Sequence, residues 1–418
     1  MMLDGQPRYD SYKDSGVPWI GAVPSDWDVL PGRACLYESS EKNTGMKVDT
    51  VLSLSYGRVK VKPIEEQFGL MPESYETYQI VQPGDIIIRG TDLQNDVTSL
   101  RTGLAKDHGI ITSAYINLRP KPNISPFYLH YLLSSYDDMK VFYGLGSGLR
   151  QNLSYDDFKY MGITVPDLNT QNRIVSFLDE KTAEIDAAVE KKRRLIELLN
   201  EQKAILINRA VTKGLNPDAP MKDSGVDWIG EIPAHWDVTK VKSVFDLLDN
   251  RRIPLSGDVR GQMTERTYDY YGASGAIDKV DDYIFDETTI LVAEDGANLV
   301  MRNLPLAIIA TGKYWVNNHA HILRPRDGDV YYWANALEAA DYRTLISGAA
   351  QPKLTKDAIK NVFLPRPPTN EQADISKRLE AIPSQFEPLE NAVAQEISTL
   401  NEFKQTLIAN AVTGKIKI

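Results

Sequence analysis

One segment of this chain occurs twice. Lys13 to Val29 reads KDSGVPWIGAVPSDWDV and Lys222 to Val238 reads KDSGVDWIGEIPAHWDV, so twelve of seventeen positions are identical after a spacing of 209 residues. A long-period repeat of this kind indicates duplicated structural units. In a chain of 418 residues it favours two similar halves, each long enough to bury its own core. We therefore expect two related sites rather than one.

A second repeated element marks the far end of each half. Ser147 to Leu178 parallels Ser347 to Leu379, because both stretches begin with Ser-Gly, reach a proline and then enter a segment that contains glutamine. The sequence Ala-Val-Thr shortly before a glycine closes each half, at 210–214 and 411–414. Each half is therefore predicted to be a globular body followed by a helix. The matched residues are Gln151 and Gln351, Pro166 and Pro367, and Gln171 and Gln372.

Composition places the chain among globular proteins of a reducing compartment. It is 42% hydrophobic and 25% charged, and no apolar run approaches the twenty residues of a membrane span. The N-terminus lacks the basic start and apolar core of a secretory signal, and Cys35 is the only cysteine. These features predict a cytoplasmic protein without disulfides or a cysteine-based metal site.

The net charge of −10 argues against indiscriminate binding to nucleic acid. Contacts to phosphates need local clusters of Lys and Arg, and the rest of an acidic chain repels DNA. A DNA-reading protein of this charge would need its basic residues on one face, a more basic partner, or both.

Apolar residues at helical spacing predict two long helices. Steps that mostly alternate between three and four residues are the seam pattern of a coiled coil, and two seams in one chain can pair with each other. About 40 residues at about 1.5 Å each would span roughly 60 Å, enough to hold two domains apart. The seam residues are Ile174, Leu178, Ile185, Ala188, Leu195, Leu199 and Leu206 in the first half, and Ile375, Leu379, Ile382, Phe386, Leu389, Val393, Ile397, Leu400, Lys404 and Leu407 in the second.

Local signals give the expected ends of these helices. Thr369 and Gln372 fit a capping box at the start of the second helix, and Gly214 and Gly414 suit helix ends. Pro383 and Pro388 fall inside the second pattern, where a proline costs about 3 kcal/mol or more. We expect a break or kink there that leaves a short helix followed by a long one.

Short apolar runs bounded by Gly, Pro or Asp predict buried strands in the two bodies. They occur at Asp85 to Arg89, Thr289 to Ala293 and Leu306 to Ala310, while Pro126 to Ser135 and Tyr331 to Ala340 favour short helices. The predicted fold class is mixed α/β (α+β): duplicated globular domains, joined by two long helices that form an antiparallel coiled coil with pseudo-two-fold symmetry.

Taken together, these motifs resemble the specificity subunit of type I restriction-modification systems. The paired DSGVxWIGxxPxxWDV segments, the SGxxQ starts, the proline before a glutamine-bearing helix and the AVT-G helix ends span nearly the whole chain. The resemblance implies two target recognition domains, at 1–166 and 217–367, and two conserved spacer helices, at 167–216 and 368–418. Each domain would read one half of a split double-stranded DNA sequence, and the helices would set the gap between the halves.

The same resemblance implies that this chain is not itself an enzyme. Adenine methylation would belong to two modification (methyltransferase) subunits, and translocation and cutting to restriction subunits. S-adenosylmethionine, ATP and Mg would be used by those partners, with no cofactor in this chain and no membrane association. The chain would serve phage defence as the reader and the scaffold of the complex.

In the first domain, basic residues and a glycine-rich loop are the candidate DNA contacts. Arg58, Lys60 and Lys62 alternate in YGRVKVK, so on a strand they would share one face, either a phosphate-contacting face or an ordinary solvated one. Arg150 and Gln151 lie in the loop GLGSGLRQ, where glycine suits either a close approach of DNA or a tight turn. Gln151 and Gln351 recur in both halves, which fits a structural role as well as base reading.

In the second domain, Trp315 to His321, WVNNHAH, concentrates amide and imidazole groups. Asn317, Asn318 and His319 are candidates for base contacts, since an Asn amide pairs with an adenine edge; a buried polar turn is the alternative. Ser274 lies in a small-residue loop beside a tyrosine pair. Lys313 and Lys353 are candidate phosphate partners.

Enzymatic and other binding functions are less well supported. His319 and His321 have no third metal ligand in the sequence, Glu294-Asp295-Gly296 fits an ordinary acidic turn, and neither nucleotide-binding glycine motif is present. Trp19, Trp27, Trp228 and Trp236 fit docking of the chain against a helix or domain better than stacking on a ligand. The alternative function is a two-lobed scaffold that binds protein or carbohydrate and does not read DNA.

Overall fold

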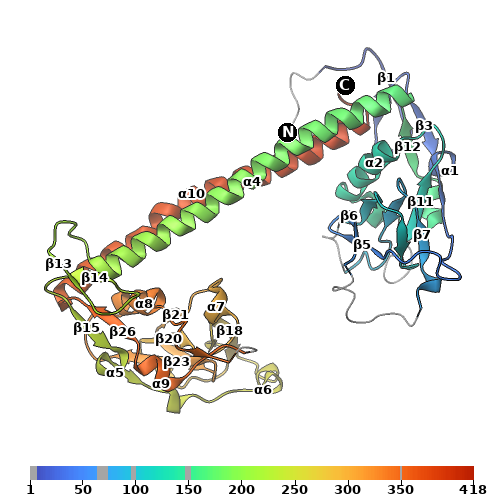
Figure 1. Cartoon of the computed structure of the whole chain (residues 1–418). Coiled ribbons are helices and arrows are strands. Elements are labelled where there is room, and N and C mark those ends of the chain that lie inside the picture. The colour runs from blue at the N-terminus through green and yellow to red at the C-terminus, as the bar shows by residue number, and fades with distance from the viewer. Residues whose placement is uncertain (1–6, 64–73, 96–99, 146–151, 349–350) are drawn as a thin grey trace. The chain divides into compact units, whose positions relative to one another are not determined.

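The computed structural model describes residues 7–63, 74–95, 100–145, 152–348 and 351–418. The chain divides into two compact units: unit 1 comprises Met1–Arg193 with Ala394–Ile418, and unit 2 comprises Arg194–Val393. The two longest helices, α4 (Leu168–Lys213, 46 residues) and α10 (Thr369–Val412, 44 residues), each contribute one part to each unit (Figure 1). The prediction of two long helices at these places is confirmed.

Unit 1 is built on a central antiparallel sheet with the order β4-β11-β8-β9. Its inner strands are short and apolar; β8 is Ile-Ile-Ile and fully buried, as expected for the middle of a covered sheet. The elements are β1 (Tyr12–Asp14), β2 (Ala22–Pro24), β3 (Asp28–Pro31), α1 (Gly32–Cys35), β4 (Leu36–Glu38), β5 (Leu52–Ser55), β6 (Arg58–Val61), η2 (Tyr75–Thr77), β7 (Gln79–Val81), β8 (Ile86–Ile88), β9 (Thr102–Leu104), β10 (Gly109–Ile111), β11 (Ile116–Pro120), α2 (Pro126–Asp138), η3 (Val141–Gly144), α3 (Tyr155–Lys159) and β12 (Gly162–Val165).

Unit 2 repeats this sheet in the order β16-β23-β20-β21 and adds a second four-stranded sheet, β18-β17-β22-β19. The additional sheet is the main difference between the described parts of the two units. The elements are β13 (Met221–Asp223), β14 (Glu231–Pro233), β15 (Asp237–Lys240), α5 (Val241–Val244), β16 (Phe245–Leu247), η4 (Asp249–Arg251), α6 (Gly257–Gly261), β17 (Tyr268–Gly272), β18 (Gly275–Val280), β19 (Phe285–Asp286), β20 (Thr289–Ala293), α7 (Asn298–Met301), β21 (Ala307–Ala310), β22 (Lys313–Val316), β23 (Ala320–Pro325), α8 (Val330–Ala339), β24 (Ile346–Ser347), β25 (Lys353–Leu354), α9 (Lys356–Lys360) and β26 (Phe363–Arg366).

The predicted strands and short helices are confirmed with small shifts at their ends. The run that begins at Asp85 forms β8, the run at Thr289 forms β20, and the run at Leu306 forms β21. The two predicted short helices are α2 and α8. In both units the strand that precedes the long helix pairs with the strand that begins at the aspartate of the repeated Trp-Asp-Val segment, as β12 with β3 and β26 with β15.

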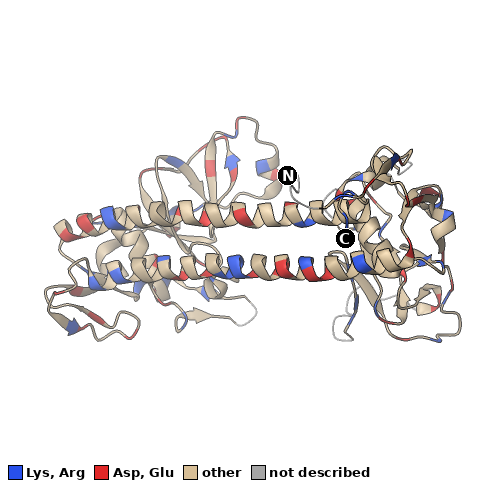
Figure 2. Cartoon of the chain, turned by 90° about the horizontal axis from the view of Figure 1, so that it is seen from above, with Lys and Arg blue, Asp and Glu red and all other residues tan. Residues whose placement is uncertain are grey.

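Ion pairs inside each unit show that α4 and α10 run antiparallel. In unit 1, Lys192 contacts Glu396 and Asp186 lies 2.7 Å from Lys404, so residues further along α4 meet residues earlier in α10. In unit 2, Lys203 lies 2.7 Å from Glu390. Figure 2, in which the ribbon is coloured by residue type, shows acidic and basic residues interspersed along both helices. The predicted antiparallel pairing is confirmed within each unit.

Two predictions about these helices are wrong. The structure has one continuous α10 that contains Pro383 and Pro388, not a short helix and a long one. Both prolines are exposed, so water can satisfy the carbonyl that each leaves unpaired, while buried Ile382 and Val393 on the same helix keep it packed. Leu195 and Leu389, predicted in the seam, are 42% and 53% exposed.

The capping box predicted at the start of α10 is also replaced by a different contact. The Gln372 side chain donates to the carbonyl of Pro367 and accepts the backbone N–H of Asp329, at 2.9 and 3.0 Å. Gln171 does the same at the start of α4, with Pro166 at 2.8 Å and the N–H of Ser125 at 2.8 Å. The repeated glutamine therefore joins each long helix to the loop before α2 or α8.

The repeated Trp-containing segment packs against a helix end in each unit. Trp27 and Trp236 are 1% and 0% exposed. Gly414 has φ +71°, and a β-carbon there would lie 2.3 Å from Pro24 and 3.2 Å from Trp27; in unit 2, a β-carbon on Gly214 would lie 2.9 Å from Trp236. The prediction that these tryptophans dock the chain against a helix is confirmed, as is termination of both helices at glycine.

A buried tyrosine completes the same contact in each unit. The Tyr128 hydroxyl lies 3.0 Å from the carbonyl of Val412, the last residue of α10, and Tyr332 lies 3.2 Å from the carbonyl of Val211 near the end of α4. Carbonyls at a helix C-terminus have no partner within the helix and, when buried, must find one elsewhere. The globular body of unit 1 thus packs around the C-terminal end of α10, and the globular body of unit 2 packs around the C-terminal end of α4.

We expect Tyr332→Phe to destabilise unit 2 because the tyrosine hydroxyl lies within hydrogen-bonding distance of two buried carbonyls, those of Val211 and Pro365, and can donate its hydrogen to either. Losing this donor should lower the free energy of unfolding by about 1–3 kcal/mol. Thermal and urea unfolding measure the change. Tyr331→Phe is the matched control, since Tyr331 is only half-buried and should leave stability unchanged. Equal effects of the two substitutions would contradict the role assigned to Tyr332.

Candidate functional site

The candidate residues of unit 2 lie mainly at one end of its central sheet, where β20 ends and β21 and β23 begin. We call this the loop end of unit 2. The N–H of Glu294 donates to the carbonyl of His319 at 2.9 Å, and the N–H of Leu354 donates to the carbonyl of Glu294 at 2.8 Å. The segment after β20 is therefore held between the turn before β23 and the segment that forms β25. Three stretches far apart in the sequence meet there.

The turn Asn317-Asn318-His319 divides into buried and exposed parts. Asn317 is 6% exposed, and its side-chain oxygen accepts the N–H of His319 at 2.8 Å. His319 pairs with Asp295 at 2.9 Å. Asn318 is exposed, and among the described residues its amide has no partner, so it can present a donor and an acceptor to a ligand. Asn317 thus forms a buried polar turn, which was one alternative, while Asn318 presents an exposed amide that is available for base contact, which was the other.

Ser274 and Lys353 lie at the same end. The Ser274 hydroxyl is 3.3 Å from the Asn298 amide on α7, and the Lys353 ammonium is 3.2 Å from Glu294. Gln351 is exposed next to the same segment. Lys313 does not belong to this group, because it begins β22 while Asn317 follows the other end of that strand. Its ammonium lies 4.5 Å from the centre of the Tyr283 ring, and the hydrogen bond between the two side chains raises its pKa.

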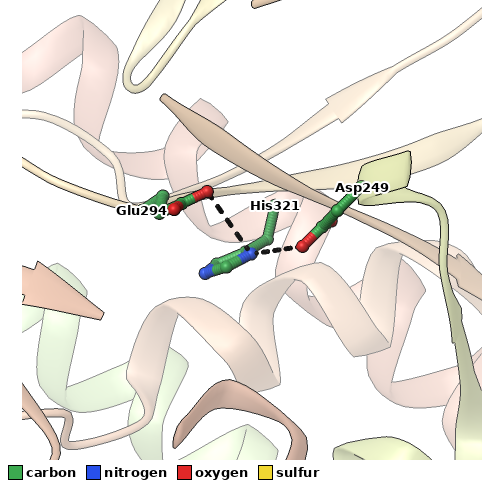
Figure 3. Close-up of side chains that lie close together, drawn as sticks. All are labelled: Asp249, Glu294 and His321. Atoms are coloured by element: carbon green, nitrogen blue, oxygen red, sulfur yellow. Dashed lines mark hydrogen bonds and ion pairs between the residues drawn. The ribbon is translucent and has the colours of Figure 1, made fainter. Parts of the chain in front are cut away.

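Beneath the loop end, His321 lies between two buried carboxylates (Figure 3). Its Nδ1 is 2.8 Å from Asp249 and 3.8 Å from Glu294, and its Nε2 is 2.8 Å from the carbonyl of Leu354. The His321 ring therefore bridges the Asp249 carboxylate and the carbonyl of Leu354. The Arg252 guanidinium contacts Glu294 and the carbonyl of Ala320, which ties η4 to β20 and β23.

The charges of this cluster favour an ion network over a metal site. The ligand atoms of Asp249, Glu294 and His321 lie within 4.8 Å of one another, which is close enough for one cation. However, Arg252 and Lys353 already supply two positive charges to the two carboxylates, and an ion would have to displace them. The structural role predicted for His321 and Glu294 therefore fits the contacts.

Opposing effects set the pKa values of these two acids. Burial would raise the pKa of Asp249, but the hydrogen bond from His321 and nearby positive charge hold it below its ordinary value. Burial also opposes ionisation of Glu294, and the hydrogen bond from Arg252 is the largest of the effects that bring its pKa below the ordinary value. Both acids remain charged when folded, so they keep Arg252 and Lys353 in place.

The corresponding loop end of unit 1 lies where β8 ends and β9 begins. The N–H of Leu153 donates to the carbonyl of Gly90 at 2.7 Å, matching the bond from Leu354 to Glu294 in unit 2. Asn152 accepts the N–H of Asp92 at 2.9 Å. The segments after β8 and before α3 therefore meet here as their counterparts do in unit 2. The candidates Arg150 and Gln151 lie outside the described residues.

The buried side chain of Arg101 holds this end of unit 1 together. It is 0% exposed, and its guanidinium donates to the carbonyls of Arg89 at 3.1 Å and Thr91 at 2.8 Å. Its backbone N–H donates to buried Asp137 at 2.6 Å. Burial is the main cause that raises the pKa of Asp137 to about 6. A charged side chain inside the fold, bonded to loop carbonyls, fixes the course of that loop.

The strand predicted for Arg58, Lys60 and Lys62 is confirmed in part. Arg58 and Lys60 are exposed on β6 with buried Val59 between them, while Lys62 is half-buried beyond the end of the strand. Arg58 and Lys60 line a groove of about 580 Å³ together with Lys106. Among the described residues, no carboxylate forms an ion pair with Arg58, Lys60 or Lys106. Lys106 was not predicted, because its position beside β6 depends on the pairing of distant strands.

The groove also contains a histidine that contributes no charge near neutral pH. Burial lowers the pKa of His130 on α2 to about 4, so its ring is neutral at pH 7. Phe127 on α2 supplies an exposed apolar surface beside it. The positive character of the groove thus rests on the Lys and Arg side chains. A groove with unpaired cations is suited to phosphate groups.

Comparison with known proteins gives this geometry a family. The family model described as type I restriction modification DNA specificity domain matches residues 81–198 and 233–399, one match in each half of the chain. The chain belongs to this family of specificity subunits. DNA sequence specificity is therefore its role, and nothing in the matches supports the alternative of a scaffold that does not read DNA.

Similar proteins extend over most of the specificity subunit. The type I restriction enzyme MjaVIII specificity subunit of Methanocaldococcus jannaschii is 23% identical and covers 95% of this chain and 94% of its own length. The StySPI specificity subunit of Salmonella potsdam is 21% identical over 72% of this chain and 67% of its own. A chain from a solved structure of the type I R-M system is 16% identical, covers 93% of this chain and 98% of its own, and has a TM-score of 0.63, so the fold is shared.

None of the described helices of the specificity subunit is both long and apolar enough to cross a membrane.

Acid should destabilise unit 2 of the specificity subunit through its two buried carboxylates. Because the pKa of Asp249 and of Glu294 is lower when folded than the ordinary 3.8 and 4.5, the unfolded chain binds protons more readily. Their stabilisation is complete above about pH 5 and is lost as the pH falls through the lower folded-state pKa values. Asp249→Asn should cost about 1–3 kcal/mol at neutral pH and weaken the dependence on acid.

Urea denaturation at a series of acidic pH values measures both effects. Asp258→Asn is the control, because Asp258 is exposed on α6. If Asp249→Asn lost stability with acid as steeply as the natural chain, the network would not be the source of the acid sensitivity.

Proposed function

We propose that this specificity subunit reads a bipartite target in double-stranded DNA with two recognition domains, at 1–166 and 217–367. The observation that carries the proposal is the repetition of one framework with different loop ends. The order β4-β11-β8-β9 recurs as β16-β23-β20-β21, and the same glutamine, tryptophan and tyrosine contacts close both bodies. The framework is repeated within the chain, but the side chains at equivalent loop ends differ. Such an arrangement suits two related domains that each recognise a different half-site.

In this proposal the contacts divide by chemistry. The exposed amide of Asn318 has the donor and acceptor that pair with an adenine edge in the major groove, and Ser274 and His319 are further candidates at the loop end of unit 2. Arg58, Lys60, Lys62, Lys313 and Lys353 would contact phosphates, which fix position without reading sequence. Arg150, Gln151 and Gln351 belong to the repeated Ser-Gly segments and remain candidates for either role.

The proposal includes partners that compensate for the acidic charge of the chain. A chain of net charge −10 repels DNA outside its basic groove, so a more basic partner would strengthen binding. We propose two modification subunits that methylate adenine with S-adenosylmethionine and restriction subunits that use ATP and Mg. This chain would supply recognition and scaffolding, with α4 and α10 setting the gap between the half-sites.

The experiment that tests the proposal is co-expression of this chain with the proposed methyltransferase subunits. The complex should co-purify, and genomic DNA of the host should become methylated at one motif that consists of two half-sequences with a fixed gap. Sequencing that detects methyladenine reads the motif directly. Co-purification without methylation, or methylation at one continuous sequence, would contradict bipartite reading.

Substitutions should separate base reading from phosphate contact. Asn318→Ala should relax preference at one base pair of one half-site, by about 1–3 kcal/mol, while Lys60→Ala should weaken binding to all sequences and reduce its dependence on salt. Binding of the complex to variant targets at several salt concentrations measures both. Asn361→Ala is the control for Asn318, because Asn361 is exposed after α9, away from the loop end. An unchanged base preference in Asn318→Ala would show that Asn318 does not recognise a base.

A further inference from the structure

A tyrosine occupies the tip of the β5–β6 hairpin in an unfavourable backbone conformation. Ser55 pairs with Arg58, so only Tyr56 and Gly57 form the turn, and both have positive φ, 48° and 72°. Two-residue hairpin turns of this kind favour Asn, Asp or Gly at the first position, because other side chains are strained there. Local folding therefore does not explain a tyrosine at position 56.

Packing does not explain it either. Tyr56 is 88% exposed, the highest value for a large hydrophobic side chain among the described residues. An aromatic ring in water gains none of the stabilisation that burial provides. The chain thus accepts a strained backbone and an exposed ring at the same residue. Strained backbone positions cluster at binding sites, so the combination of strain and exposure directs attention to a ligand contact.

The hairpin tip lies at the loop end of unit 1. A β-carbon built on Gly57 would be 3.2 Å from Leu100 and 3.5 Å from the carbonyl oxygen of Thr102, the first residue of β9. Leu100 directly precedes Arg101, whose guanidinium is bonded to the carbonyls of Arg89 and Thr91, so the residues just before β9 lie beside the hairpin tip. The hairpin tip therefore lies at the end of unit 1 that corresponds to the loop end of unit 2, where the exposed amide of Asn318 lies.

The charges around the tyrosine favour DNA as the ligand. Arg58 directly follows the turn and Lys60 lies two residues further along β6, and among the described residues neither pairs with a carboxylate. An aromatic ring beside two unpaired cations matches the alternation of bases, sugars and phosphates along a DNA groove. An apolar protein surface would leave both cations desolvated without a partner.

We propose that Tyr56 is a DNA-contacting residue of the first recognition domain. Its ring lies in a groove of the half-site against base edges and sugars, while Arg58 and Lys60 bind the flanking phosphates. This assignment rests on the proposed function and adds to it a contact residue in unit 1, where Arg150 and Gln151 lie outside the described residues.

The test compares stability and DNA binding in Tyr56→Asn. Asparagine suits the positive φ, so the melting temperature of the purified complex with methyltransferase subunits should stay the same or rise. The dissociation constant for the bipartite target should increase by about five-fold to about a hundred-fold, with little change for unrelated DNA. Tyr56→Phe separates the ring from the hydroxyl and should retain most of the affinity. Opposite responses of stability and binding are the expected signature.

A matched control and three outcomes keep the inference falsifiable. Tyr160→Asn is the control, because Tyr160 is 64% exposed but lies beside Arg33 of α1, away from the loop end. Tyr56→Asn that binds the target as tightly as the natural complex overturns the inference and leaves bipartite reading intact. Tyr56→Asn that no longer co-purifies with methyltransferase subunits assigns Tyr56 to a protein contact and also overturns it. Failure of the natural complex to bind a bipartite target refutes the proposed function itself.

Discussion

The fold depends on a buried tyrosine hydroxyl that reaches the end of a long helix. In unit 1 the Tyr128 hydroxyl bonds to the carbonyl of Val412, and Thr164 bonds to the same carbonyl at 2.8 Å. In unit 2 the Tyr332 hydroxyl lies within hydrogen-bonding distance of the carbonyls of Val211 and Pro365. These carbonyls would otherwise be buried without a partner, at a cost of about 1–3 kcal/mol each. The packing of Trp27 and Trp236 against the same helix ends excludes water from them.

This contact explains which features repeat and which differ. The duplicated segments, the central sheet and the contacts of Gln171 and Gln372 all serve to hold a long helix against a body. The described strands differ most outside this framework, where unit 1 has the β5–β6 hairpin and unit 2 has a second sheet. Separation of framework from loop ends lets recognition residues change without disturbing helix packing. The buried network around His321 adds rigidity below one loop end, where exposed side chains need fixed positions.

The sequence predicted the framework well because its signals are local or repeated. The Trp-Asp-Val segments, the glycine helix ends and the apolar runs that form β8 and β20 could all be read directly. Continuity of α10 through Pro383 could not, because it depends on whether the proline faces solvent. The roles of Arg101 and Asp249 also depend on distant partners: Asp249 meets His321 only after strands far apart in sequence have paired. Exposure of Tyr56 and its place beside Leu100 are likewise properties of the folded hairpin.

The contact between Tyr128 and Val412 has a consequence for the order in which a ribosome completes the molecule. Unit 2 consists of the continuous stretch Arg194–Val393, so all of its parts have been made before the last 25 residues. Unit 1 begins first, yet it needs Ala394–Ile418, which follow after roughly 200 further residues. At typical synthesis rates this interval lasts about 10–40 s. The globular body of unit 1 is therefore made first but completed last. Until then, the surface that packs against the end of α10 is exposed to other chains in the cell.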